Sequence, residues 1–186
     1  MKKKLKIIGA IIGSIILALG VYIAYNIFFP VSPKSTINHS SGFSDFEVVY
    51  SRPYKNDRLI FGDESSGALV PFGKYWRTGA NAATTFETSS DIIFNDKELK
   101  AGKYTLYTVP GKEVWKVVLN HESDRYFARF EPDYSKDVLE TFVYAREFST
   151  QYAYEQLSIG FENLDNSLVL TIIWDTIRIS IPIMKQ

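Results

Sequence analysis

The chain has 186 residues, a length that allows one domain of ordinary size. Its composition, 46% hydrophobic and 15% aromatic, is typical of a folded protein. The formal net charge is zero, but the four charges that precede Pro30 are all lysines, so the remainder carries a net charge of −4. A mildly acidic domain lacks the basic surface that neutralises phosphates, so we expect no nucleic-acid partner.

The chain contains no cysteine. This excludes disulfides, thiolate nucleophiles, zinc–cysteine sites, iron–sulfur clusters and a lipid anchor on an N-terminal Cys. The two histidines, His39 and His121, are too few to favour a metal site built on several His. The sequence also shows no G-x-S-x-G element, phosphate-binding loop or metalloprotease helix, so we expect no metal and no cofactor.

Residues 7–29 are almost wholly apolar, and the run exceeds the roughly 20 residues that cross a bilayer core as a helix. The lysines before it favour a cytoplasmic N-terminus. We therefore predict a membrane anchor over residues 1–29, crossing the cytoplasmic membrane once, with the rest of the chain in the periplasm or at the cell surface. A cleaved signal peptide is the alternative, because Ala18-Leu19-Gly20 resembles a cleavage site. A buried core helix is disfavoured, since no polar face interrupts the run.

The stretch from Pro30 to Ser44 is rich in Pro, Ser and Gly. This composition predicts a linker, assigned to residues 30–42, that leads the chain off the membrane. His39 falls within it and is interpreted as a solvated side chain. The folded domain is then expected to span residues 43–186.

From Phe43 onward, apolar and polar residues alternate with the period of β-strands. Strands are predicted around 46–51, 84–88, 91–94, 104–109, 115–120, 138–148, 157–161, 168–174 and 177–183. The last three are expected to form an antiparallel meander, with a turn over 163–166 and with Pro182 at a strand end or sheet edge. A short helix is conceivable within 121–137. Eight or nine short strands with little helix predict an all-β domain, an antiparallel β-sandwich or barrel-like fold.

Several elements of this sequence resemble those of a known family. They are YSRP, IFG, LVPFGKYWRTGANAATTF, LKAGKYTLYTVP, WKVVLN and DVL, which begin at Tyr50, Ile60, Leu69, Leu99, Trp115 and Asp137. In this order they are similar to the bacterial domain-of-unknown-function family 2911, over about residues 32–183. The resemblance implies an envelope protein of unknown biochemical role. The usual form of the central motif is GANEAT, and here the Glu position is Ala82, so no acidic role can be assigned there.

The segment Gly73–Phe86 is the densest in residues that can both pack and recognise. Arg77, beside Trp76, carries a rigid guanidinium that can hold a carboxylate or a sugar hydroxyl. Its structural alternative is to bridge loops by pairing with a carboxylate or with backbone carbonyls. Arg52 is a candidate to converge with Arg77. Asn81 ends the Gly-Ala-Asn triplet, which also fits a tight turn in which Asn tolerates left-handed backbone angles.

Tyr104 and Tyr107 have opposite parity on one predicted strand, so one of them should face outward or line a groove. Tyr107 is therefore included in the candidate ligand-binding set with Arg52, Trp76, Arg77 and Asn81. Trp115 and Trp174 fit core positions. His121, with Glu122 and Asp124 nearby, could form an acid–base pair, although polar residues at strand ends are usually solvated. Asp133 and Asp137 lack a third ligand at calcium-loop spacing.

Together these features predict a membrane-anchored binding module for an envelope glycan or an envelope protein. The alternative is a hydrolase or isomerase of envelope sugars that uses Arg77 with an unassigned carboxylate.

Overall fold

A computed structural model describes residues 2–29, 31–123, 130–164 and 167–186. The chain divides into two units, residues 1–33 and residues 34–186. The first contains helix α1 (Lys2–Phe28). Over residues 7–25 this helix is long and apolar enough to cross a membrane, which a signal sequence would also be. The N-terminus therefore indicates secretion or membrane anchoring.

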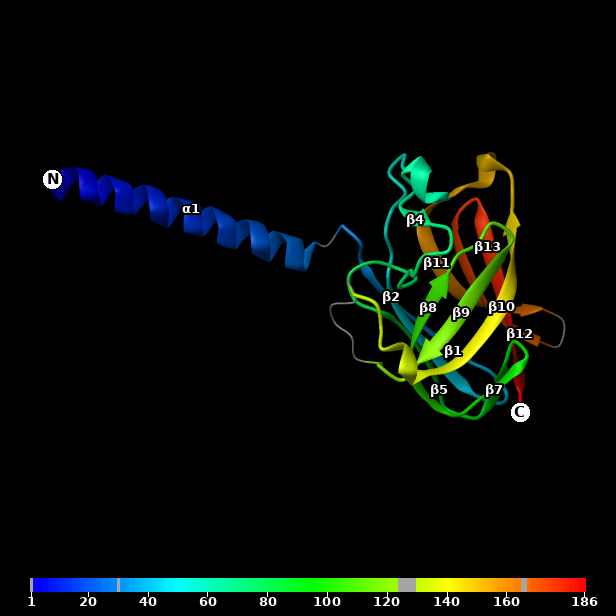
Figure 1. Ribbon diagram of the computed structural model, residues 1–186. Helices are drawn as coiled ribbons and strands as arrows, with labels where there is room; N and C mark the ends of the chain where they lie inside the picture. Colours follow the sequence, from blue (N-terminus) through cyan, green and yellow to red (C-terminus); the bar gives the residue numbers. More distant parts are fainter. Residues whose placement is uncertain (1, 30, 124–129, 165–166) are drawn as a thin grey trace. The chain divides into compact units, whose positions relative to one another are not determined.

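The second unit consists mainly of β-strands (Figure 1). The strands are β1 (Lys34–Ser40), β2 (Asp45–Ser51), β3 (Phe61–Gly62), β4 (Val70–Pro71), β5 (Thr84–Thr88), β6 (Ile92–Phe94), β7 (Lys97–Leu99), β8 (Gly102–Val109), β9 (Val114–Asn120), β10 (Asp137–Glu147), β11 (Tyr154–Leu164), β12 (Ser167–Asp175) and β13 (Ile177–Lys185). Short 3₁₀ helices cover Glu64–Ser66, Tyr134–Lys136 and Thr150–Tyr152.

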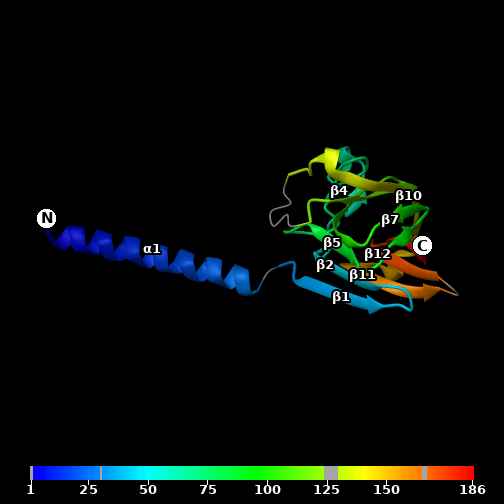
Figure 2. The ribbon, with the colours of Figure 1, turned by 90° about the horizontal axis from the view of Figure 1, so that it is seen from below.

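Within the described residues, eleven strands form one sheet in the order β1-β2-β5-β8-β9-β10-β13-β12-β11, with β6 beside β13 and β7 beside β6. The sheet folds over at β10, whose residues 137–144 pair with β9 and whose residues 145–147 pair with β13. The first and last strands of the order, β1 and β11, consequently lie near each other (Figure 2). The prediction of an antiparallel all-β domain behind an N-terminal helix is confirmed.

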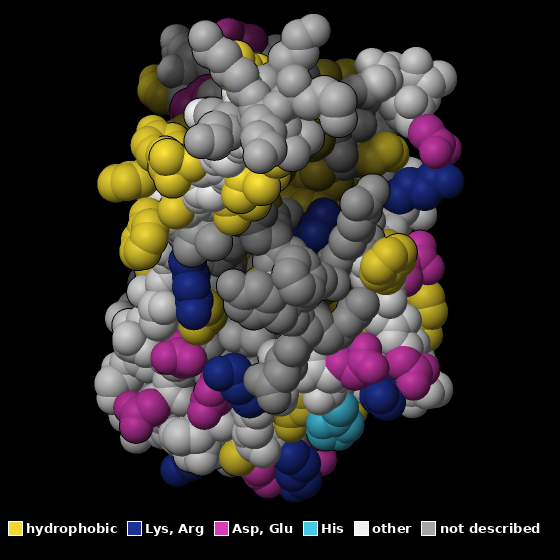
Figure 3. All heavy atoms as spheres, turned by 90° about the vertical axis from the view of Figure 1, so that its left-hand side faces the viewer, with side chains coloured by type: hydrophobic (Ala, Val, Ile, Leu, Met, Phe, Trp, Pro, Cys, Tyr) yellow, Lys and Arg dark blue, Asp and Glu magenta, His cyan; other side chains and the backbone are white. Residues whose placement is uncertain are grey.

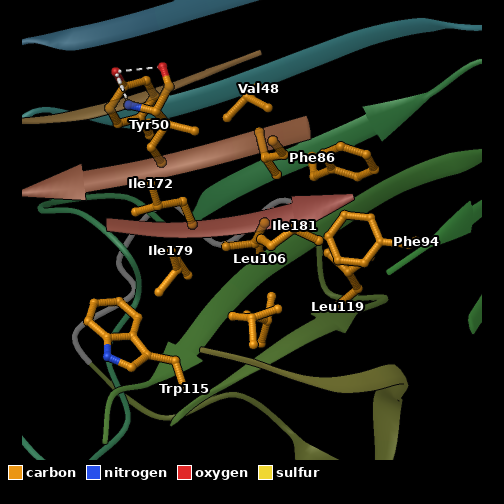
Figure 4. Packing of buried hydrophobic residues seen from close by; sticks show 14 of the residues in the cluster. Val48, Tyr50, Phe86, Phe94, Leu106, Trp115, Leu119, Ile172, Ile179 and Ile181 are labelled. Atoms are coloured by element: carbon orange, nitrogen blue, oxygen red, sulfur yellow. Dashed lines mark hydrogen bonds between the residues drawn. The ribbon is translucent and has the colours of Figure 1, made fainter. Parts of the chain in front are cut away.

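The core lies between the two halves of this folded sheet (Figure 4). Alternate residues of each strand point into it, as the period-two pattern requires. One end of the core is aromatic: the ring of Trp76 contacts those of Phe61, Trp115 and Trp174 at centroid separations of 5.7, 6.0 and 5.8 Å. The predicted core positions of Trp115 and Trp174 are therefore confirmed. The fully buried aliphatic core includes Val48, Leu106, Leu119, Leu170, Ile179 and Ile181.

The structure differs from the expected linker at residues 34–40, which form β1 and pair along their whole length with β2. Only Ile37 is a large apolar residue in this strand, so the alternation that marks a strand is weak in the sequence. Ile37 packs against the core, and the ring of His39 stacks on that of Phe161 at 5.2 Å. His39 is thus a packed strand residue and not a solvated linker side chain.

Pro182 lies inside β13 and not at an edge of the sheet. On one side of β13, residues 177–179 pair with β10 and residues 183–185 pair with β6. Pro182 falls in the interval between these two pairings, so its missing N–H interrupts no ladder. In the region 121–137, a 3₁₀ helix covers Tyr134–Lys136, whereas residues 124–129 and the predicted turn residues 165–166 lie outside the described residues.

Candidate functional site

The segment around Trp76 pairs with the same edge of β8 as β5 does, further along that strand. The N–H of Trp76 donates to the carbonyl of Thr108 at 2.8 Å, and the N–H of Thr108 donates back at 2.9 Å. β5 takes up pairing with β8 from Thr84, which lies opposite Leu106. Residues 78–83 are therefore a six-residue loop inserted into what is otherwise one strand line beside β8. We call residues 78–83 the strand-interrupting loop.

The loop has an unusual backbone. Thr78 and Asn81 have φ angles of +55° and +57°, in the left-handed region. This conformation is uncommon for Asn and costly for a β-branched residue. The buried Thr78 is held by its neighbours, since its hydroxyl donates to Thr108 Oγ1 at 3.1 Å and its carbonyl accepts from Thr84 Oγ1 at 2.8 Å. The left-handed role expected for Asn81 in a turn agrees with this geometry.

Gly79 is required by close packing. A Cβ atom at this position would lie 3.0 Å from the carbonyl oxygen of Ser51 and 3.2 Å from Thr84 Oγ1. These separations are too short for a side chain unless the neighbours move. The loop thus packs against the end of β2, and its backbone is constrained at Thr78, Gly79 and Asn81.

Arg77 precedes this loop and is partly buried. Its Nη1 donates to the carbonyl of Asn81 at 3.1 Å, so the loop that follows Arg77 also orients its guanidinium. Among the residues that the structure describes, no carboxylate forms an ion pair with Arg77. Extending the Trp76–Thr108 pairing by one residue places Arg77 opposite Tyr107, on the face of the sheet away from the core.

Tyr107 is only 1% exposed although it does not belong to the hydrophobic core. Its ring contacts that of Tyr75 at 5.2 Å and that of Tyr134 at 6.2 Å between centroids. Tyr104, of opposite parity, lies in the core, so the prediction that the two tyrosines face opposite sides is confirmed. The outer face of β8 therefore carries an aromatic group made of Tyr75, Tyr107 and Tyr134, which we call the tyrosine cluster.

A part-buried polar network underlies the tyrosine cluster. The hydroxyl of Tyr107 donates to Asp137 Oδ2 at 2.7 Å, and Asn120 Nδ2 donates to Asp137 Oδ1 at 2.7 Å. Asn120 Nδ2 also donates to the carbonyl of Asp133 at 2.9 Å. These bonds fix the start of β10 and the 3₁₀ turn that carries Tyr134.

Burial raises the pKa of the Tyr107 hydroxyl strongly, and its bond to Asp137 adds to the effect. Burial, followed by a hydrogen bond to Glu131, raises the pKa of Tyr134 to about 12. Both hydroxyls are therefore protonated near neutral pH, and they act as hydrogen-bond donors and not as bases. Tyr134 remains 49% exposed and presents the accessible part of the cluster.

Two of the sequence candidates serve the fold through the contacts they make. Arg52 Nε donates to the carbonyl of Leu157 at 3.0 Å and its Nη2 donates to Ser158 Oγ at 3.1 Å, so its guanidinium joins β2 to β11. Trp76 is buried in the aromatic end of the core, and its Nε1 donates to the carbonyl of Gly79 at 3.3 Å. Arg77, Asn81 and Tyr107 are the candidates that the strand-interrupting loop and β8 bring to one region.

The region around His121 holds polar groups in structural contacts. The ring of His121 lies against that of Tyr104 at 5.5 Å between centroids, and the backbone N–H of His121 donates to the carbonyl of Lys136 at 3.0 Å. Glu122 Oε1 pairs with Lys136 Nζ at 2.9 Å. Asp124, the third member of the conceivable acid–base group, lies outside the described residues. Across the described ranges, no cluster of three or more His, Asp or Glu could hold a metal ion.

The charges on the face drawn in Figure 3 are mixed, with Lys and Arg interspersed among Asp and Glu. No single-sign patch of the kind that binds nucleic acid is visible in this view. The expectation of no nucleic-acid partner stays a prediction.

A family model described as "Protein of unknown function (DUF2911)" matches residues 32–183. The chain belongs to this family. The DUF2911 match covers the β-domain from its first strand to Ile183 near the end of β13, including the strand-interrupting loop and the tyrosine cluster. No curated protein and no solved structure matches the chain.

Sequence reasoning missed part of this candidate site. Asn120, Tyr134 and Asp137 were not among the candidate ligand-binding residues, because the contacts of Asn120 with Asp133 and Asp137 join residues that lie far apart in the sequence. One signal was available. An Asn that ends a strongly apolar strand, followed by polar residues, is a place where a buried amide needs partners.

Proposed function

We propose that this DUF2911 domain is a non-enzymatic binding module, secreted or tethered by α1, that recognises a component of the cell envelope. Its contact surface is the guanidinium of Arg77, the strand-interrupting loop and the exposed edge of Tyr134. A glycan that carries a carboxylate is the ligand favoured by these groups, and an envelope protein with an exposed acidic residue is the other candidate.

The observation that carries the proposal is the state of Arg77. Its guanidinium is oriented by the carbonyl of Asn81, yet no carboxylate of the described residues pairs with it. A planar fork of donors in a fixed orientation is suited to bidentate contact with a carboxylate. Because the orientation exists before the ligand arrives, less side-chain entropy is lost on binding.

The backbone of the loop supports this reading. Thr78 adopts a left-handed φ of +55° while it is fully buried. Left-handed backbone at a β-branched residue costs free energy, of order 1–3 kcal/mol, and persists only where the surroundings enforce it. A strand that continued directly from residue 77 to residue 84 would avoid that cost. This sequence nevertheless contains the insertion, and its effect is to fix Arg77 and Asn81 at the surface.

The tyrosine cluster supports a glycan over a protein. Tyr134 is half exposed to solvent, and its ring lies beside that of Tyr107, which Arg77 faces across the strand pair. A flat aromatic ring packs against the apolar face of a sugar, and a protonated phenol donates to its hydroxyls. Since Asp137 already accepts bonds from Tyr107 and Asn120, its role here is to hold the ring in place.

The hydrolase or isomerase alternative needs a carboxylate that works together with Arg77 on a substrate. None of the described carboxylates forms a hydrogen bond or an ion pair with Arg77, and the Tyr107 and Tyr134 hydroxyls have raised pKa values that disfavour a role as base. Binding without turnover is therefore the function proposed.

The test compares Arg77→Ala with Arg58→Ala. Arg58 is a matched control because it is exposed and its guanidinium also donates to nearby backbone carbonyls, those of Tyr54 and Lys55. The full chain in detergent is applied to an array of neutral and uronic-acid-containing oligosaccharides, and hits are titrated by calorimetry. We expect acidic glycans to bind the parent and Arg58→Ala but to lose about tenfold or more with Arg77→Ala, as one charge-assisted bond predicts.

Equal binding by the two variants, with melting temperatures unchanged, would overturn the proposal. No hit on the array, together with capture of an envelope protein that depends on Arg77, would assign the same surface to a protein ligand. Loss of folding in Arg77→Ala would instead give the arginine a structural role.

A further inference from the structure

Strand β1 has one edge that no other strand of the described residues covers. Asp45 on β2 exchanges hydrogen bonds with Ser89 beyond β5, both at 2.9 Å, so the backbone groups of Asp45 point toward β5. Because antiparallel bonding alternates along a strand, Phe46, Val48 and Tyr50 point toward β1. Their partners in the register are His39, Ile37 and Ser35. The backbone groups of Lys34, Thr36, Asn38 and Ser40 therefore point away from β2.

The edge of β11, the other end of the sheet, is capped. The N–H of Leu157 donates to the carbonyl of Pro53 at 3.0 Å, and Arg52 Nε donates to the carbonyl of Leu157. The hydroxyl of Tyr50 accepts from the N–H of Ile159 at 2.9 Å and donates to its carbonyl at 3.3 Å. Side chains and loop backbone thus replace a neighbouring strand as far as Ile159.

β1 has no such protection. Within the described part of the chain, no hydrogen bond joins the outward backbone groups of Lys34, Thr36, Asn38 or Ser40 to another residue. The strand lies at the periphery of the domain (Figure 2). It is seven residues long and contains neither proline nor bulge, and Lys34 at its start is its single charged side chain. Proteins usually block such edges, because an open row of donors and acceptors templates another strand.

We propose that β1 pairs antiparallel with β1 of a second copy of this chain, about a two-fold axis at Ile37. This register brings Thr36 opposite Asn38 of the partner subunit and Lys34 opposite Ser40 of the partner subunit. Every outward residue then faces an outward residue, so each of these pairs exchanges two backbone hydrogen bonds. If the register shifted by one residue, these outward residues would instead lie opposite Ser35, Ile37 and His39 of the partner subunit, whose backbone groups already bond to β2.

The charges on β1 and β2 favour the same register. The Ser40 hydroxyl donates to Asp45 Oδ1 at 2.5 Å, so an exposed carboxylate marks that end of the edge. Antiparallel pairing brings Lys34 to this end of the partner subunit, and a parallel pairing would bring the two Lys34 side chains together. Charge complementarity therefore selects a two-fold, self-complementary contact over a parallel one.

The first test measures the mass of the full chain in detergent by light scattering over a range of concentrations. We expect a dimer, and we expect Asn38→Pro to raise its dissociation constant about tenfold or more, because proline removes an N–H at the centre of the interface. The Asn38 N–H is not used within the subunit, so the folded monomer should survive. Asn38→Ala, which keeps the N–H, should dimerise like the parent. A monomer throughout, or a dimer indifferent to Asn38→Pro, would overturn the proposal.

The second test uses the absence of cysteine in the natural sequence. Ile37 faces its own counterpart as a non-hydrogen-bonded pair, with about 4.5 Å between Cα atoms, a separation that a disulfide spans. Ile37→Cys should cross-link under mild oxidation, whereas Phe142→Cys, at an exposed site on β10, should not. If Ile37→Cys cross-links no faster than the Phe142→Cys control, the proposed register is wrong. This holds even if the protein is still a dimer, because the two copies could then be held together through α1. Arg77→Ala should leave both readouts unchanged, so this inference stands apart from the proposed function.

Discussion

The hydroxyl of Tyr107 and the carboxylate of Asp137 are joined by a hydrogen bond of 2.7 Å that passes over the strand between them. Tyr107 belongs to β8 and Asp137 begins β10, and β9 lies between the two. Asn120, at the end of β9, donates to the other oxygen of the same carboxylate. One acidic side chain therefore ties together three neighbouring strands, on the face of the sheet opposite the core.

Replacing Tyr107 with Phe removes this bond while keeping the ring. We expect a loss of about 1 to 3 kcal/mol in the free energy of unfolding, since the part-buried carboxylate loses a donor. Tyr144→Phe is the control, because Tyr144 is 77% exposed on β10. Urea denaturation of the two variants should differ in midpoint and not in slope. A shared midpoint would show that the Tyr107–Asp137 bond contributes nothing net.

Alkaline pH should destabilise the domain through its tyrosines. In the unfolded chain a tyrosine ionises near 10, whereas the pKa of Tyr134 is about 12 and that of Tyr107 is also raised in the folded state. Between these values the unfolded state has lost a proton that the folded state retains, so stability is fully present below about pH 10 and falls as pH rises. Tyrosinate absorbance recorded alongside circular dichroism should detect this loss, and Tyr134→Phe should reduce it. An unfolding free energy that is flat across this window would contradict the pKa directions.

Arg52 and Arg77 should separate into a structural and a recognition residue. Arg52→Ala removes bonds to Leu157 and Ser158 and should lower stability by about 1 to 3 kcal/mol. The affinity of the folded Arg52→Ala protein for the glycan should equal that of the parent. Thermal melts and the titration described for Arg77→Ala provide both readouts. Reduced affinity in a folded Arg52→Ala protein would return Arg52 to the ligand-binding set.

Gly79→Ala should destabilise the strand-interrupting loop. The new methyl group would meet the Ser51 carbonyl at 3.0 Å, so we expect a cost of about 1 to 3 kcal/mol. Gly42→Ala is matched in chemistry but meets no atom within 4 Å and should change stability little. Melting temperatures of the two variants decide the point, and equal values would show that the backbone at Gly79 yields without strain.

The sequence predicted the β-strands wherever burial of one face required apolar and polar residues to alternate. The meander of β11, β12 and β13 alternates large apolar residues over long runs, and hydropathy alone located it. β1 was missed for the opposite reason: its residues are mostly Ser, Thr and Asn, and it is held by backbone bonds to β2 and by the packing of Ile37 and His39. Backbone bonding leaves little trace in composition.

The candidate site could be predicted only in part. Gly73–Phe86 was recognisable because glycines, aromatics and an arginine were concentrated there. The Tyr107–Asp137–Asn120 network could not be derived, because it joins side chains from three strands whose register is set by the folded sheet. The sequence alone also did not show that Trp76 points into the core while its neighbour Arg77 points to the opposite face of the sheet. That assignment required the pairing of Trp76 with Thr108.

The position of β1 at the start of the domain has a mechanical consequence. If α1 is held in a membrane and a ligand is pulled away from it, tension enters the domain at Lys34, where β1 pairs with Ser51. The load then acts on one end of the β1–β2 ladder, so its hydrogen bonds break in sequence and not all together. β1 should therefore peel away at low force while the rest of the sheet stays folded, and the tether would lengthen by the span of one strand before the binding surface was disturbed.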